Sequence, residues 1–131
     1  MSMYSNILVC TDGSKHSEKA IDQAIEIAKK FNSKITLMHV YQPPRALVQM
    51  PRYNERILKL GKDRIKKAGL HVTDMPEMGH PAERICEVIG KGKFDLTILG
   101  SRGMSEVKSF FMGSTSDKVS HHATCPVLIV R

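Results

Sequence analysis

The residues of this sequence that are best suited to chemistry lie at positions 100–115, which read G-S-R-G-M-S-E-V-K-S-F-F-M-G-S-T. Gly100 and Gly103 are three positions apart, nine residues follow, and Gly113 then precedes two hydroxyl residues. Glycine lets backbone N–H groups approach an anion without a Cβ in the way, and it tolerates positive φ. Hydroxyl groups where a helix begins are also placed to bind phosphate. The spacing therefore predicts a phosphate-binding loop.

The glycines alone would also fit two ordinary turns, one that closes a strand and one that opens a helix. A Walker A loop is excluded because no Gly-Lys-Ser/Thr sequence follows, and the dinucleotide fingerprint has its glycines within about six residues. Position favours the phosphate interpretation. Gly100 directly follows the apolar run at residues 96–99, and open α/β sheets bind ligands at the carboxyl ends of such strands.

Apolar runs and helical periodicity alternate along the chain, and they define the elements that must position this loop. Strands are expected at residues 7–10, 35–41, 70–78, 94–99 and 126–130. Helices are expected before Phe31, at residues 52–68, from Pro81 onward and at residues 115–122. This alternation predicts one domain, residues 1–131, built on a single doubly wound parallel sheet of five strands with helices on both faces.

The strand order 3-2-1-4-5 follows if the first strand is central and the chain winds outward on both sides. The switch point then lies between the first and fourth strands, whose carboxyl ends are Asp12 and Gly100. Asp12 belongs to the turn T-D-G-S, in which Asp12 or Ser14 can also cap the next helix. The topology therefore brings Asp12 and the glycine loop to one crevice.

The composition is that of a globular protein, with 131 residues of which 41% are hydrophobic and 25% charged. No apolar run is long enough to cross a bilayer, and the first residues lack the features of a signal peptide. We therefore expect a cytoplasmic protein with no membrane partner. Cys10, Cys86 and Cys125 form no disulfide or zinc pattern and are expected to be buried hydrophobic residues.

The formal net charge of +7 favours anionic partners, and the excess is densest at residues 52–67. Aromatic residues make up only 5% of the chain and Trp is absent, so groups that stack on single-stranded bases are few. We interpret the basic helix as a solvated face and regard nucleic acid binding, which rests on charge alone, as the weakest alternative. His39 is expected to be a hydrogen-bonded strand residue, and His121 and His122 offer too few ligands for a metal.

Four stretches resemble the universal stress protein family: V-C-T-D-G-S after the first strand, H-V-Y with the second, G-H-P-A-E-R-I before the third helix, and G-S-R-G…G-S-T…C-P-V-L-I-V at the end. The resemblance extends from Asn6 to Val130, and the element G-x-x-G-x9-G-[ST] is typical of the ATP-binding branch. It implies ATP at the switch point, with Mg or Mn carried by the phosphates, and a homodimer. Residues 126–130 predict the same dimer, because an uninterrupted apolar edge strand favours pairing with a second copy.

The resemblance also implies roles for individual residues. Asp12 would lie near ribose and adenine, and the main chain of Val40 would contact adenine. Leu99 and Gly100 would line the base and the sugar, whereas Arg102 and Gly103 would border the phosphates. The implied nucleotide-binding set is Thr11, Asp12, Val40, Leu99, Gly100, Arg102, Gly103, Gly113, Ser114 and Thr115, and the last three would hold the phosphates. Cys10 stands where the family often has proline.

Two functions of different classes remain open. The first is an ATP-binding regulatory module with slow or no turnover, and the second is an ATP-hydrolysing or nucleotidyl-transferring enzyme of the same architecture. Phosphoryl transfer needs a carboxylate that holds a metal and a group that positions water. The only acids in or near the loop are Glu106 and Asp117, without a partner that the sequence can assign. We therefore expect a binding module with no catalytic or metal-ligating residue.

Overall fold

Strands and helices alternate along the whole of the described chain. The computed structural model describes residues 3–41, 51–102 and 113–131, without the side chains of residues 51 and 52. The strands are β1 (Asn6–Cys10), β2 (Lys34–Tyr41), β3 (Val72–Met78), β4 (Leu96–Gly100) and β5 (Val127–Val130). The helices are α1 (Lys15–Phe31), α2 (Pro51–Lys67), α3 (Pro81–Lys91) and α4 (Ser114–His122).

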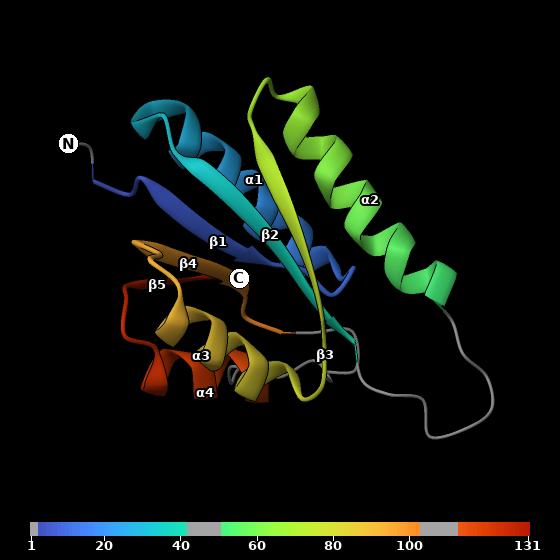
Figure 1. Ribbon diagram of the computed structural model, residues 1–131, viewed down its shortest axis with the longest axis vertical. Helices are drawn as coiled ribbons and strands as arrows, with labels where there is room; N and C mark the ends of the chain where they lie inside the picture. The colour runs from blue at the N-terminus through green and yellow to red at the C-terminus, as the bar shows by residue number, and fades with distance from the viewer. Residues whose placement is uncertain (1–2, 42–50, 103–112) are drawn as a thin grey trace.

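The five strands form one parallel sheet in the order β3-β2-β1-β4-β5. Helices α1 and α2 cover one face of the sheet, and α3 and α4 cover the other (Figure 1). The predicted doubly wound fold is confirmed, and so is the switch point, because β1 pairs with β2 on one side and with β4 on the other.

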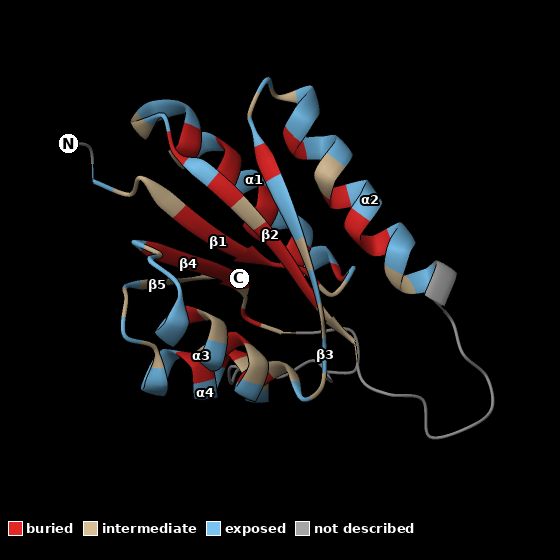
Figure 2. Ribbon diagram, in the orientation of Figure 1, coloured by how far each residue is buried: buried red, intermediate tan, exposed pale blue. Residues whose placement is uncertain are grey.

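Each central strand sends alternate side chains into two separate hydrophobic cores. In β1, Ile7 and Val9 pack under α1 and α2, whereas Leu8 and Cys10 pack on the side of α3 and α4. Figure 2 shows the resulting buried bands along β1, β2 and β4. A parallel strand covered on both faces must be apolar throughout, which is why the sequence shows this strand as an uninterrupted apolar run.

Short polar signals set the helix boundaries. Ser14 caps α1, because its side chain accepts a hydrogen bond from the backbone N–H of Ser17. At the other end Asn32 adopts the left-handed conformation with φ of 53°. Gly69 does the same after α2 with φ of 82°, and since this turn occupies the residues after α2, β3 starts at Val72 and not at residue 70 as expected.

The two sheet edges differ in character. On β3, Pro76 is consistent with the predicted edge position, and Thr73, Asp74 and Met78 are also exposed. On β5 all four residues are apolar and half-buried, with Leu128 packed against one core and Ile129 against the other. Strand β5 begins one residue later than expected, although the carbonyl of Pro126 still accepts a hydrogen bond from β4.

Several cations of the basic helix α2 are paired with carboxylates. Lys59 pairs with Asp63 on the same helix, Lys62 with Asp74 of β3, and Arg64 with Asp22 of α1. The last two pairs join α2 to β3 and α1, and all three partly neutralise the positive charge of the helix. Within the described residues, every helix is too short or too polar to span a bilayer.

Candidate functional site

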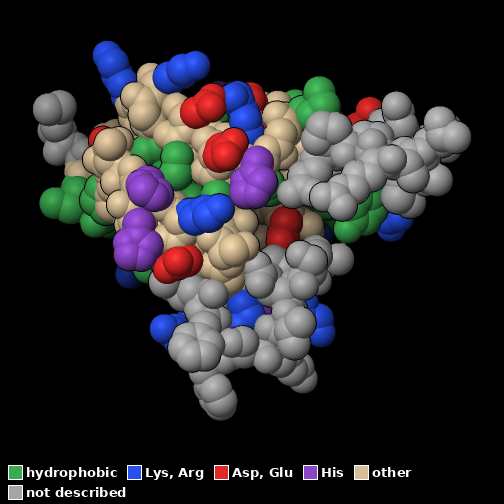
Figure 3. Space-filling model, turned by 90° about the horizontal axis from the view of Figure 1, so that it is seen from below, with side chains coloured by type: hydrophobic (Ala, Val, Ile, Leu, Met, Phe, Trp, Pro, Cys, Tyr) green, Lys and Arg blue, Asp and Glu red, His purple; other side chains and the backbone are tan. Residues whose placement is uncertain are grey.

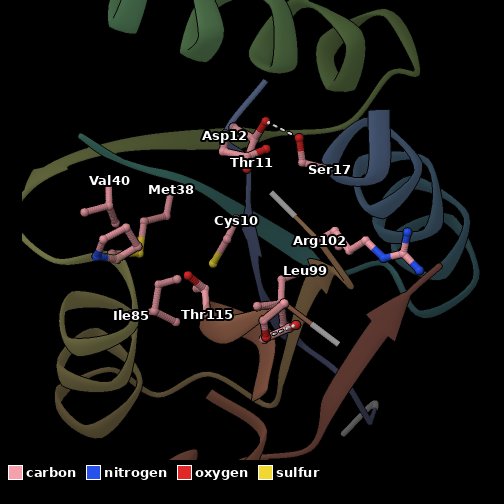
Figure 4. Close-up of a pocket in the computed structure, with 14 residues that line it drawn as sticks. Cys10, Thr11, Asp12, Ser17, Met38, Val40, Ile85, Leu99, Arg102 and Thr115 are labelled. Atoms are coloured by element: carbon pink, nitrogen blue, oxygen red, sulfur yellow. Dashed lines mark hydrogen bonds between the residues drawn. The ribbon is translucent and has the colours of Figure 1, made fainter. Parts of the chain in front are cut away.

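A pocket opens at the carboxyl edge of the sheet, between the ends of β1 and β4, where the direction of winding reverses. It spans about 530 Å³ when the adjoining space that is open to solvent is included. Figure 4 shows side chains that converge on it from both halves of the chain. Its lining residues are Cys10, Thr11, Asp12, Ser17, Met38, Val40, Pro81, Ile85, Leu99, Gly100, Arg102, Gly113, Thr115 and Ser116.

Most of the residues implied by the family resemblance line this one pocket. They are Thr11, Asp12, Val40, Leu99, Gly100, Arg102, Gly113 and Thr115. Ser114 is exposed at the first position of α4 and is not among the lining residues of the described chain. Gly103 lies outside the described residues. Segments that are about ninety residues apart in the sequence are thus brought together by the sheet order.

One wall of the pocket is apolar. It is formed by Cys10, Met38, Val40, Ile85 and Leu99, which also belong to or pack against the core between the sheet and helices α3 and α4. The wall is therefore the exposed end of a rigid core and not a surface patch. A flat, largely apolar group such as an aromatic ring can lie against it without deforming the fold.

The opposite side of the pocket is formed by the turn between β1 and α1. The backbone N–H of Thr11 donates to the carbonyl oxygen of Met38 in β2 at 2.8 Å, and the hydroxyl oxygen of Thr11 lies 3.1 Å from that of Ser17. One carboxylate oxygen of Asp12 accepts from the backbone N–H of Ser14 at 2.9 Å. Of the two capping candidates, Ser14 caps α1, and Asp12 instead stabilises the turn before it.

The amino-terminal end of α4 closes the third side. The carbonyl of Ser101, just after β4, accepts from the backbone N–H of Gly113 at 2.7 Å and from the hydroxyl of Ser116 at 2.9 Å. These two bonds join the start and the end of the glycine loop. The first turn of α4 therefore has a fixed position at the pocket, and a helix amino terminus favours an anion.

The structural reasons for two glycines differ from the predicted ones. Gly113 has φ of −65° and ψ of 160°, so it needs no left-handed conformation, and its N–H is engaged by Ser101. A Cβ at Gly100 would lie 2.7 Å from the Cβ and 2.8 Å from the carbonyl carbon of His16. Gly100 thus permits the close approach of α1 to β4. Positive φ occurs instead at Gly13, in the turn after β1.

The charged lining residues are Asp12 and Arg102. Figure 4 shows the guanidinium of Arg102 directed away from Val40 and Met38, at the far side of the labelled residues. The cation therefore lies away from the labelled residues Val40 and Met38 of the apolar wall. A ligand with one apolar and one anionic end matches this distribution.

Burial raises the pKa of the Cys10 thiol to about 12, and the negative charge of Asp12 adds to the rise. All three cysteines are free. Burial also raises the pKa of Cys86 on α3. Cys10 is therefore a neutral component of the apolar wall at physiological pH, as expected for a buried hydrophobic residue.

Neither of the two acids considered for catalysis in the sequence analysis is among the lining residues of the described pocket. On α4, Oδ1 of Asp117 lies 3.4 Å from Nε2 of His121, and both side chains are exposed. Glu106 lies outside the described residues. Figure 3 shows the face over α3 and α4, where acidic, basic and histidine side chains are interspersed. Among the described residues no group of three or more His, Cys, Asp or Glu has the arrangement of a metal site.

Sequence reasoning did not identify six of the lining residues as part of the site: Cys10, Ser17, Met38, Pro81, Ile85 and Ser116. Ser17 and Ser116 lie in the first turns of α1 and α4, and Pro81 begins α3. Every helix after a parallel strand starts at the carboxyl edge of the sheet. The residues in the first turns of α1, α3 and α4 could therefore have been predicted to lie near the pocket.

Known proteins with similar sequences share one family name. The sequence model of the universal stress protein family matches residues 3–131. Universal stress protein YxiE of Bacillus subtilis is 32% identical over 98% of this chain and 100% of its own length. A universal stress protein of Thermus aquaticus is 31% identical over the same shares, 98% and 100%.

Solved structures share the fold. A universal stress protein crystallised in complex with cAMP has a TM-score of 0.80 and 29% identity, with 99% of both chains covered. A family member from Arabidopsis thaliana with AMP bound has a TM-score of 0.74, covering 96% of this chain and 90% of its own. At 19% identity the latter likeness shows the fold alone.

Proposed function

The chain belongs to the universal stress protein family, and from this premise we propose that it binds an adenine nucleotide, ATP in the first place, as a regulatory module with slow or no turnover. Nucleotide-dependent contacts with other proteins would be its output. The expected location is the cytoplasm. The single observation that carries the proposal is the pocket at the switch point, which combines an apolar wall with a helix amino terminus.

The proposed ligand fits the distribution of polarity in the pocket. Adenine would lie against Val40, Met38 and Leu99, and its edge would be contacted by the main chain of Val40. The ribose would lie beside Thr11 and Asp12, and a carboxylate is an acceptor for a sugar hydroxyl. Hydroxyl and carboxylate groups at the sheet edge thus supply polar contacts next to an apolar base site.

The phosphates would lie at the first turn of α4. Thr115 and Ser116 line this end of the pocket with hydroxyl groups, and Arg102 supplies a cation. Ser114 and Gly103 remain proposed phosphate contacts, and Gly113 contributes space more than a donor because its N–H is engaged. A Mg²⁺ or Mn²⁺ ion would be carried by the phosphates, since such ions keep several waters and use few protein ligands.

The relative crystallised in complex with cAMP supports an adenine nucleotide as the ligand class. In cAMP a single phosphate is closed onto the ribose, whereas ATP extends three phosphates beyond it. The position of α4 next to the pocket favours the extended ligand. Comparing the two nucleotides therefore tests the phosphate part of the proposal separately from the base part.

Isothermal titration of the purified protein with Mg-ATP is the decisive experiment. We expect a dissociation constant in the micromolar range, about −7 to −9 kcal/mol, and a shift of the melting temperature. Titrations with cAMP, AMP and GTP serve as controls for phosphate chain and base. No heat and no thermal shift at millimolar nucleotide would contradict the proposal. Incubation with Mg-ATP tests the enzymatic alternative: ADP is measured for hydrolysis, and pyrophosphate for nucleotidyl transfer. Multiple turnovers to either product would favour the enzyme.

We also propose that the protein is a homodimer through the outer edge of β5. Its four apolar residues remain half-buried in a single chain, so part of each side chain is still available for contact. A second copy related by a two-fold axis would cover the same edge on both chains. The dimer would then join two nucleotide sites in one particle.

A further inference from the structure

His39, in the middle of β2, is held by hydrogen bonds at both of its ring nitrogens. It is 4% exposed. Its Nδ1 lies 2.9 Å from the carbonyl oxygen of Thr11, and its Nε2 lies 2.8 Å from Oδ1 of Asn54 in the first turns of α2. One buried side chain therefore links the turn between β1 and α1, which lines the pocket, to helix α2.

The Thr11 contact determines where the imidazole proton lies. A backbone carbonyl can only accept, so Nδ1 must be protonated and donate to Thr11. The amide of Asn54 can face Nε2 with either its oxygen or its nitrogen, since the two atoms exchange by rotation of the amide group. The geometry thus requires a proton at Nδ1 whichever way Asn54 is turned.

Helix α2 supports the same turn at a second point. Gly13 has φ of 85°, and a Cβ built on it would lie 3.1 Å from Cγ1 of Ile57. The chain at Thr11 is thus held by β2 through its N–H and by His39 through its carbonyl. Asp12, whose side chain lines the pocket, directly follows this doubly held residue.

We propose that His39 is a positioning residue for the nucleotide site: by bonding Thr11 and Asn54 it orients Asp12 and couples the pocket to the amino-terminal part of α2. The proposal rests on the proposed function, because Asp12 is placed there as the ribose contact. His39 itself does not touch the ligand, since it is not among the lining residues of the described pocket. Its effect is transmitted through the backbone of the turn.

Two substitutions separate the two hydrogen bonds. In Asn the amide nitrogen is as many bonds from Cβ as Nδ1 is in His, so His39→Asn can keep the bond to Thr11. In Gln the amide nitrogen matches Nε2, so His39→Gln can keep only the bond to Asn54. We expect His39→Gln to weaken ATP binding about tenfold and His39→Asn to weaken it by less than about threefold. Equal affinity of the two variants, or tighter binding by His39→Gln, would overturn the proposal.

The link to α2 is tested at Asn54, which is not a lining residue of the described pocket. Asn54→Ala is expected to weaken ATP binding about threefold, and unchanged binding would overturn the coupling. Ile65→Val is the matched control, because Ile65 is buried in the carboxyl-terminal half of the same helix. It should lower the melting temperature without changing the affinity, which shows that lost stability alone does not affect the pocket.

A measurement on the wild-type protein without nucleotide keeps the proposal testable if a variant fails to fold. Imidazole ¹⁵N shifts distinguish a protonated from an unprotonated Nδ1, and we expect His39 to carry its proton at Nδ1. An unprotonated Nδ1 would overturn the proposal.

If the wild type binds no nucleotide, the proposed function fails. The positioning role is then decided by the amide shifts of Asp12 and Gly13, which should move in His39→Gln and stay near wild type in His39→Asn.

Discussion

Asp12 has one structural role in the turn and one proposed role in ribose binding, and substitutions can separate the two. One carboxylate oxygen accepts from Ser14 and stabilises the turn, and the proposed ribose contact would use the same side chain. An amide at this position keeps an oxygen for Ser14, because Asn forms the same type of turn as Asp. Loss of the side chain removes both interactions.

We therefore expect Asp12→Asn to retain the melting temperature of the wild type but to bind ATP several-fold more weakly. Asp12→Ala should lose about 1 kcal/mol of stability as well as about 1 kcal/mol of binding free energy. Titration calorimetry and thermal unfolding of both variants measure the two effects. Wild-type affinity in both variants would leave Asp12 with a structural role alone.

Cys10 is expected to be the least reactive of the three cysteines. With a pKa of about 12, only about one thiol in ten thousand is ionised at pH 8, and the thiolate is the reactive form. Iodoacetamide should label Cys10 at least about a hundredfold more slowly than Cys125, and more quickly as the pH rises. Peptide mass spectrometry follows each site, and labelling in urea provides the control. Equal labelling rates in the folded protein would contradict the buried, neutral state.

At the scale of the elements, the contact between α1 and β4 depends on Gly100. A Cβ there meets backbone atoms of His16 that cannot rotate away. We expect Gly100→Ala to lower the free energy of unfolding by about 1–3 kcal/mol. Gly90→Ala is the matched control, because nothing lies within 4 Å of a Cβ at that helical position, and Ala should stabilise the helix there by up to about 1 kcal/mol. Urea denaturation measures both, and equal stability of the two variants would refute the packing explanation.

Gly113, at the start of α4, is expected to matter for space in the pocket and not for its backbone conformation. Since its φ and ψ are accessible to any residue, Gly113→Val should fold. The branched side chain would occupy the proposed phosphate site and weaken ATP binding at least about tenfold. Circular dichroism checks the fold and calorimetry the binding; a folded variant with normal affinity would show that the phosphates lie elsewhere.

At the scale of the whole molecule, light scattering should give twice the chain mass of 14.7 kDa. Leu128→Lys should shift the population toward monomer, because it places a charge on the proposed contact edge. Leu128 is half-buried, so a lysine can direct its ammonium group to solvent without unfolding the sheet. Met78→Lys is the control: it adds the same charge to the opposite edge strand, where Met78 is 54% exposed, and should remain dimeric. A wild-type monomer at high micromolar concentration would refute the dimer.

The sequence alone determined the fold class, and it predicted the strand order and the crevice of the pocket on the condition that the first strand is central. Buried parallel strands must be apolar throughout, and helices must show one apolar stripe, so both leave local patterns that can be read directly. Once β1 is central, the carboxyl ends of β1 and β4 must adjoin. Asp12 and Gly100 were therefore predictable as neighbours without coordinates.

Only the tertiary structure decided which atoms at the site are in contact or hydrogen-bonded to one another. His16 against Gly100, Ser101 against Gly113, and His39 between Thr11 and Asn54 are contacts between residues far apart in the chain or on different elements. Their distances depend on how closely each helix packs on the sheet, which side-chain volumes across the whole core determine. Periodicity reports the direction of a side chain, but it carries no information on that spacing.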